Sequence, residues 1–169
     1  VVPDEPLAKL RRVEIWVHAT SPGTRCMAYH PGAQWLRDHD MNPEMEHDIE
    51  IGNVATFVEW TYEQPWMVLH ELAHAYHDRF LPGGFENPDV LSAFNRARDS
   101  KTYESVVHWN GRDTRHYALT NQMEYFAEAT EAYFGQNDFY PFVRAELMRH
   151  DPEGLKLMEK VWGKPQKRR

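Results

Sequence analysis

The sequence predicts an α+β fold, and three features indicate it. Residues 13–19 alternate apolar and polar side chains, as a half-buried strand does. Residues 65–81 form one long apolar segment bounded by helix start and stop residues. Most of the later chain has helical patterns, interrupted by one hairpin motif. Strands followed by helices are typical of the α+β class, and 169 residues suit a single domain over 1–169.

Short elements are expected in the first third of the chain. Residues 1–12 are polar and are interpreted as a lead-in to the strand at 13–19. A short helix is predicted over residues 33–39, with Trp35 and Leu36 pointing inward. Residues 48–60 start with strand-like alternation and become ambiguous within the continuous apolar run that follows.

The segment 65–81 is predicted to be a central helix. Pro65 suits a first helical turn, and Pro82-Gly83-Gly84 ends the pattern. Between these residues the segment is apolar on nearly every side, and a helix of that kind lies in the interior. This helix should therefore organise the packing of the rest.

The later chain is predicted to form helices with capping residues, plus a hairpin. Asn110-Gly111 is a strong hairpin turn and lies between two strand-like arms. Capping residues precede three of the helical patterns. The predicted helices are 88–98 after Asn87, 121–134 after Thr120 or Asn121, 141–149, and 152–162 after Asp151.

Composition limits the partners and the chemistry. A net charge of −7 disfavours nucleic acid, and the basic residues at the end are interpreted as a solvated tail: Lys164, Lys167, Arg168 and Arg169. The single cysteine, Cys26, excludes an internal disulfide and a thiolate-rich metal site. No window is apolar enough for a membrane span. The start at Val1, without Met or a signal peptide, suggests a trimmed mature piece, which slightly favours a secreted or periplasmic location. Oligomeric state is left open.

The central helix carries a His-Glu-x-x-His motif. Helical spacing places His70 and His74 one turn apart on one face, so both imidazoles can bind one metal ion. Glu71 lies off that line, where its carboxylate can take a proton from a metal-bound water. The motif therefore predicts one Zn²⁺ per chain, with Glu71 as general base.

A catalytic zinc site needs a third protein ligand. One class of motif continues with Gly and His three and six residues after the second histidine, but this chain has His77 and Phe80 there. The other source is a carboxylate from a later helix. Glu124, Glu128 and Glu131 share one face of the predicted helix 121–134. If this face meets the motif helix, Glu124 can bind the metal and Glu128 can hold a ligand imidazole through its other nitrogen. The alternative is that they form a solvated acidic stripe.

Together, His70-Glu-Leu-Ala-His74 and Tyr117-x-x-Thr120-Asn121-x-x-Glu124-Tyr-Phe-Ala-Glu128 resemble a known family of zincin metallopeptidases. It contains the catalytic domain of anthrax lethal factor, the Pro-Pro endopeptidases and the Mlc titration factor. The resemblance covers roughly residues 65–135. It implies a zincin-like domain in which the N-terminal strands pack on the motif helix and the helical half supplies the third ligand. By position it implies that His70, His74 and Glu124 bind zinc, that Tyr117 stabilises the oxyanion, and that Glu128 is the acid one turn after the ligand.

Physical reasoning agrees with Tyr117, because a phenol at the end of the hairpin can donate to a developing alkoxide. The alternative is an ordinary strand tyrosine. His77 is interpreted as a helix histidine whose hydrogen bonds are satisfied, and Asp78 as a residue that orients a ligand or forms a salt bridge. Glu44-x-x-His47 has di-iron spacing but is predicted to lie in a loop.

The expected function is zinc-dependent hydrolysis of peptide bonds in a peptide or protein substrate. The substrate is expected to pair with a strand edge near residues 48–58. Two alternatives remain. The chain could be a metal-binding module of the same fold that holds a protein partner, or a metal hydrolase of a non-peptide amide or ester.

Overall fold

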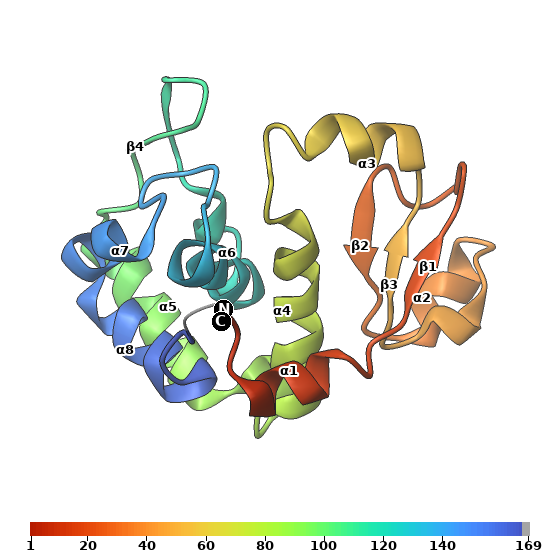
Figure 1. Cartoon of the computed structure of the whole chain (residues 1–169), viewed down its shortest axis with the longest axis horizontal. Helices are drawn as coiled ribbons and strands as arrows, with labels where there is room; N and C mark the ends of the chain where they lie inside the picture. The colour runs from red at the N-terminus through yellow and green to blue at the C-terminus, as the bar shows by residue number, and fades with distance from the viewer. Residues whose placement is uncertain (167–169) are drawn as a thin grey trace.

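The computed structural model describes residues 1–166 and has a mixed α+β architecture, as predicted (Figure 1). Three residues of the predicted basic tail, Lys167, Arg168 and Arg169, lie outside the described part. The α-helices are α1 (Asp4–Leu10), α2 (Ala33–Asp38), α3 (Val54–Trp60), α4 (Met67–Phe80), α5 (Pro88–Ser100), α6 (Gln122–Phe134), α7 (Arg144–His150) and α8 (Pro152–Trp162). The strands are β1 (Ile15–Val17), β2 (Met27–Tyr29), β3 (Ile49–Ile51), β4 (Val106–Val107) and β5 (Asp113–Thr114). The short 3₁₀ helices are η1 (Pro43–Met45), η2 (Gly84–Glu86) and η3 (Tyr117–Leu119). None of the helices described is long and apolar enough to cross a bilayer.

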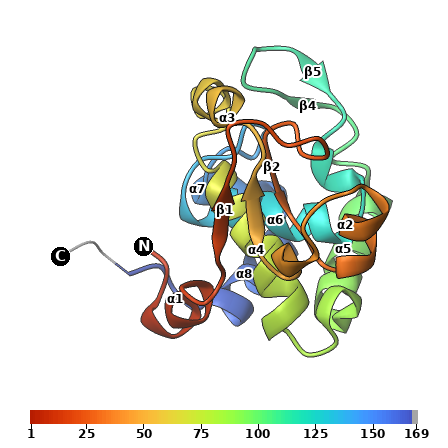
Figure 2. The ribbon, with the colours of Figure 1, turned by 90° about the vertical axis from the view of Figure 1, so that its right-hand side faces the viewer.

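A small mixed sheet forms the N-terminal half. Its strand order is β1-β3-β2, in which β3 runs parallel to β1 and antiparallel to β2. One face packs on α4 through Ile49, Tyr29 and Ala75. α2 lies against the opposite face, where Trp16 packs on a cluster that includes Leu36 (Figure 1). Figure 2 views the molecule from the sheet side, with α4 and α6 behind the strands.

α4 lies between the sheet and the helical half, which confirms its predicted central position (Figure 1). Its residues contribute to the core on both sides. Ala75 faces the sheet cluster, whereas Leu69, Ala73 and Tyr76 belong to the large cluster shared with α5, α6 and α8. A helix buried on two sides needs apolar residues almost all round, which explains the continuous pattern in the sequence.

The predicted caps are present in the helical half. Asn87 Oδ1 accepts hydrogen bonds from the backbone N–H groups of Asp89 and Val90 at the start of α5. Asn121 Oδ1 accepts from Met123 and Glu124 at the start of α6, at 2.9 Å each. Asp151 Oδ1 accepts from Gly154 N at the start of α8. These caps satisfy N–H groups that the helices leave free, so they fix where each helix begins.

Several predictions about the N-terminal half are wrong. Residues 4–10 form a helix rather than a lead-in, with Pro6 and Leu10 buried. The strand favoured near the start of 48–60 is present as β3, and the ambiguous run after it forms α3, which Asn53 Oδ1 caps through Thr56 N. β2 was not expected, and Trp35 is 46% exposed rather than inward.

The expected substrate edge is wrong as well. β3 pairs on both sides, and the residues after it are helical, so residues 48–58 offer no free strand edge. The hairpin at Asn110-Gly111 is confirmed, with strands of two residues each and Gly111 at φ +80°. The free edge that faces α4 belongs to β2.

Candidate metal centre

His70 and His74 lie one turn apart on α4, on the face that meets α6. Their ring centroids are 4.8 Å apart and the ring planes are inclined by 78°. α4 and α6 pack closely, so the α4 imidazoles meet the first turns of α6. The helical spacing that the sequence predicts therefore brings both rings to one place.

Glu124 completes this group from α6. Its Oε2 lies 3.0 Å from His70 Nε2 and 3.3 Å from His74 Nε2. The three ligand atoms all lie within 4.8 Å of one another. Two ligands bound to a tetrahedral zinc at about 2.0–2.1 Å are separated by roughly 3.3 Å. Two imidazoles and a carboxylate at these separations fit one zinc ion.

The electrostatics of the group favour a charged carboxylate. Burial raises the pKa of Glu124, but hydrogen bonds with His70 and His74 outweigh it and hold that pKa well below its ordinary value. Burial lowers the pKa of His70, whereas its hydrogen bonds with Glu124 and Glu131 raise it well above its ordinary value. Glu124 is therefore in the ionised form that a metal ligand requires.

Glu71 follows His70 on α4 and contacts the sheet. Its Oε2 accepts a 2.8 Å hydrogen bond from the backbone N–H of Tyr29 in β2. This contact fixes the carboxylate and leaves its second oxygen without a part in that bond, and Glu71 lines the same pocket as the ligand group. Glu71 is therefore placed beside the ligands without being one of them.

Glu131 hydrogen bonds with His70 on the ring's other side. His70 Nδ1 lies 2.7 Å from Glu131 Oε1, and Glu128 Oε1 lies 3.6 Å from the same nitrogen. Glu128, the acid that the resemblance indicated, is thus close to His70 but does not hydrogen bond with it. Glu131 lies on the acidic face that the helical spacing predicts, so the sequence contained the signal but did not distinguish it from Glu128.

A concentration of buried acids surrounds this contact. Glu128, Glu131 and Asp138 are each at most 5% exposed. Burial, followed by the charge of Glu131, raises the pKa of Glu128 well above its ordinary value, and burial also raises the pKa of Glu131 and Asp138. No group of residues 1–166 hydrogen bonds with Glu128 Oε2. His70, Glu128 and Glu131 form a second group with metal-ligand distances, but Glu131 already occupies His70 Nδ1.

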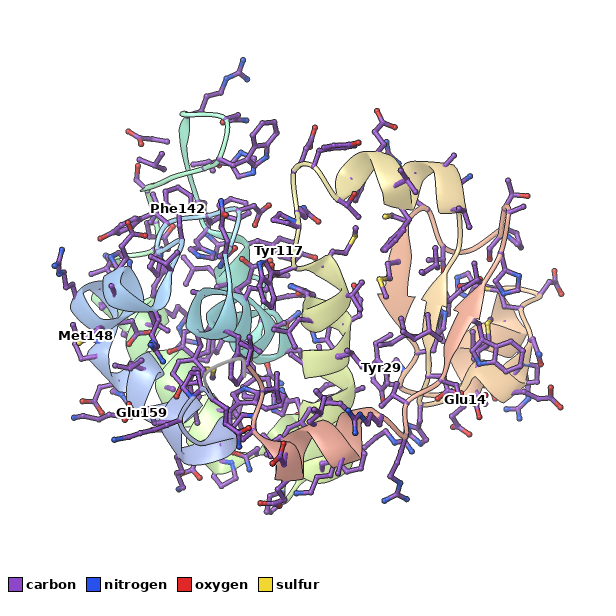
Figure 3. All side chains as sticks on the ribbon, in the orientation of Figure 1. Glu14, Tyr29, Tyr117, Phe142, Met148 and Glu159 are labelled. Atoms are coloured by element: carbon purple, nitrogen blue, oxygen red, sulfur yellow. The ribbon has the colours of Figure 1, made fainter. Side chains whose placement is uncertain are left out.

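A pocket of about 560 Å³ opens over the ligand group. β2 forms one wall, and η3 and the segment after α6 form the other, with His108, Asp138 and Phe139. Tyr117 belongs to η3 rather than to a strand, is 47% exposed and lines the pocket. Figure 3 shows it in the space between α6 and α4. Burial, followed by the charge of Glu124, raises its pKa, so the phenol keeps its proton and can donate.

Other residues singled out in the sequence lie outside the ligand group. His77 is fully buried between Phe85 and Phe126, and neither ring nitrogen has a hydrogen-bond partner among residues 1–166, so the expectation of a satisfied histidine is wrong. Asp78 Oδ2 accepts a 2.6 Å hydrogen bond from Tyr29 Oη, across to β2. His47 lies in the turn after η1, as expected, and its Nδ1 is 3.3 Å from Asp78 Oδ2.

Cys26 lines the same pocket as the ligand group. Its Sγ lies 3.4 Å from Met67 Sδ, and the side chain is 5% exposed. Burial, followed by the charge of Glu71, raises the pKa of the thiol. A thiol that is kept protonated in this way is a poor nucleophile, consistent with a packing role.

Comparisons of the chain with known protein families, with curated proteins and with solved structures find no match. The geometry itself offers two imidazoles and a carboxylate at zinc-binding separations. It also offers a fixed carboxylate and a protonated phenol on the same pocket. These are the components of a hydrolytic metal site.

Proposed function

We propose that the protein is a zinc-dependent peptidase with a zincin-like fold, similar to the lethal factor and Pro-Pro endopeptidase family. One observation carries the proposal: His70, His74 and Glu124 converge from two helices, and Glu71 lies beside them with its carboxylate fixed. An α+β chain whose sheet packs on the motif helix is consistent with this fold.

His70, His74 and Glu124 would hold the zinc ion. When bound, zinc supplies a Lewis acid that lowers the pKa of water and polarises a carbonyl. Glu131 holds His70 through Nδ1, so that Nε2 is directed at the ligand group. The ligands are thus oriented before any substrate arrives.

Glu71 would move the protons of the reaction. Its free oxygen takes a proton from the attacking water and returns it to the leaving amine. The hydrogen bond that the Tyr29 N–H donates to the other oxygen keeps the carboxylate in one orientation. Tyr117, which keeps its proton, would donate a hydrogen bond to the oxyanion of the tetrahedral intermediate.

The substrate would lie along β2, the strand edge that borders the pocket. The even-numbered residues in and beside β2 direct their main-chain groups toward β3. Gly52 N donates a hydrogen bond to Cys26 O, and His30 N donates one to Asp48 O. The main-chain N–H and C=O of Met27 and the C=O of Tyr29 therefore face the free edge, while the Tyr29 N–H on the same edge donates to Glu71. An extended peptide can pair with that edge, which replaces the expected pairing at residues 48–58.

The test is cleavage of a mixed peptide library by zinc-loaded protein, with Glu71→Gln beside it. Glu71→Gln should retain zinc and lose roughly 10²–10⁴-fold in cleavage rate, since it removes only the general base. Glu153→Gln, at an exposed position of α8, is the matched control and should cleave as the unchanged protein does. Undiminished cleavage by Glu71→Gln would refute the mechanism, and absence of cleavage by every protein would refute the peptidase.

Metal analysis tests the ligand set without reference to activity. Glu124→Gln should lose zinc on dialysis, whereas Glu128→Gln should keep it, because only Glu124 contacts both motif imidazoles. Full zinc content in Glu124→Gln would show that the third ligand has been assigned wrongly.

A further inference from the structure

A second hollow continues from the metal pocket along β2. It has a volume of about 560 Å³ and runs along residues 23–32, with Trp35 of α2 and Trp60 at the end of α3. We call it the β2 groove. Residues 26–29 and Trp60 line both the groove and the metal pocket, so the two are continuous along one strand edge.

The two faces of β2 lead to different surroundings. Tyr29 lies between the sheet and α4 (Figure 3), where it packs with Ala75. Its hydroxyl donates a hydrogen bond to Asp78. Because side chains alternate along a strand, Ala28 points to the opposite face, toward α2. The small Ala28 side chain leaves open the space that the groove occupies.

An added strand would alternate in the same way. Side chains on its α4 side would enter the metal pocket, which is lined by the acidic residues Glu71, Glu124, Glu128 and Asp138. The side chain between them would point to the α2 side and enter the β2 groove. The register of the edge therefore sends alternate substrate residues into chemically different spaces.

The β2 groove is lined by aromatic surface that is held in place. Trp35 is 46% exposed and stacks on His39 at 3.9 Å between ring centroids, while His30 lies at 5.8 Å on a nearly parallel plane. Trp60 also lines the groove, with the guanidinium of Arg25 5.3 Å from the centroid of its ring. Exposed aromatic rings of fixed orientation offer apolar contact area at low entropic cost, as recognition surfaces do.

We propose that the β2 groove is a specificity subsite for a large apolar or aromatic side chain of the extended peptide substrate. This inference rests on the proposed peptidase function and names its substrate class. Trp35 and Trp60 flank the apolar side chain, and the backbone pairs with Met27. In the substrate, the residues before and after the one with this apolar side chain face the acidic metal pocket.

The first experiment compares cleavage profiles of a peptide library between the unchanged protein, Trp35→Phe and Trp35→Ala, all loaded with zinc. The unchanged protein should select Phe, Trp or Leu at one position fixed relative to the cleaved bond. Trp35→Ala should lose this selection and raise KM about tenfold for the preferred peptide with little change in kcat, since even one methylene group in an apolar pocket is worth about 10–200-fold. Trp35→Phe should retain much of it. Tyr62→Ala, at an aromatic residue 86% exposed outside the groove, should leave the profile unchanged.

A second measurement separates this inference from the proposed function. Binding of hexapeptides with Phe or Ala at the selected position is measured on Glu71→Gln, with and without Trp35→Ala. A preference for Phe of about tenfold that disappears in Trp35→Ala supports the subsite, even where cleavage is not observed. Two results would overturn the proposed subsite without affecting the proposed peptidase function. One is cleavage that depends on Glu71 but shows no preference for an apolar side chain. The other is a preference that Trp35→Ala does not change.

Discussion

Two regions of the protein bury carboxylates, and they differ in how the charge is compensated. Glu50 of β3 is 0% exposed on the sheet face that carries α2. It accepts a hydrogen bond from Thr24 Oγ1 and lies 3.0 Å from His30 Nε2. Burial raises its pKa, but the hydrogen bonds with Thr24, Ser21 and His30 outweigh it and lower that pKa.

The acidic pocket between α4 and α6 has the opposite balance. Burial raises the pKa of Glu128 and of Glu131, the charge of Glu131 raises that of Glu128 further, and Glu128 Oε2 has no partner among residues 1–166. Glu50 also leaves one buried oxygen, Oε1, without a hydrogen-bond partner among residues 1–166, but its other oxygen has Thr24 and His30 as partners, and these contacts lower its pKa. The pocket holds more acids than its donors can satisfy, which suits a site that binds a cation.

The largest expected effect tests Glu50. Glu50→Leu leaves Thr24 and His30 buried without their acceptor, and each unsatisfied group costs about 1–3 kcal/mol, so the free energy of unfolding should fall by about 2–6 kcal/mol. Urea unfolding of zinc-free protein measures this change in the free energy of unfolding. Glu14→Leu, an exposed position beside the same sheet (Figure 3), should change the value by less than about 0.5 kcal/mol. A loss below 1 kcal/mol for Glu50→Leu would remove the contrast between the two regions.

The second prediction compares two buried histidines, one with a carboxylate partner and one without. His30 has Glu50 as a partner, whereas burial, followed by the charge of His74, lowers the pKa of the unpartnered His77 to about 4. The unfolded state gains the proton near pH 6.5 and the folded state near 4, so stability falls as the pH drops between these values. Over that window the loss from His77 is roughly 3 kcal/mol.

His77→Leu should remove this loss. The free energy of unfolding of zinc-free protein is measured at pH 7 and at pH 4. Its decrease between the two pH values should be smaller by roughly 3 kcal/mol in His77→Leu than in the unchanged protein. Equal differences in the two proteins would show that His77 finds a partner or water that the buried environment does not suggest.

The smallest effect distinguishes two acids of the pocket. Glu131→Gln should weaken zinc binding by about 10–100-fold, because it replaces the charged partner of His70 Nδ1 by a neutral amide. Glu128→Gln should have a much smaller effect, since Glu128 lies 3.6 Å from that nitrogen. Competition with a zinc chelator measures both constants, and a larger loss in Glu128→Gln would reverse the assignment.

Local features of the chain were predictable. The boundaries of α4, the caps Asn87, Asn121 and Asp151, and the position of His70 and His74 on one face depend on contacts within a few residues. Helical spacing and capping act over one or two turns, so the sequence carries them directly. The α+β class follows from the same local patterns.

Other features were decided by packing. β2 is three residues long, too short for a periodic pattern, and it exists because it pairs with β3. The choice of Glu131 over Glu128 depends on how α6 meets α4, across 61 residues of sequence. The burial of His77 between Phe85 and Phe126 has the same cause.

By itself, the sequence determined the central helix, the spacing of its two histidines and the acidic face of α6. Tertiary structure decided which acids meet those histidines, which strand edge borders the pocket, and that an aromatic groove continues from it. The reason is physical. Hydrogen bonds along a helix are set by neighbours in the chain, whereas contacts between helices and strands depend on angles and registers that the whole core fixes.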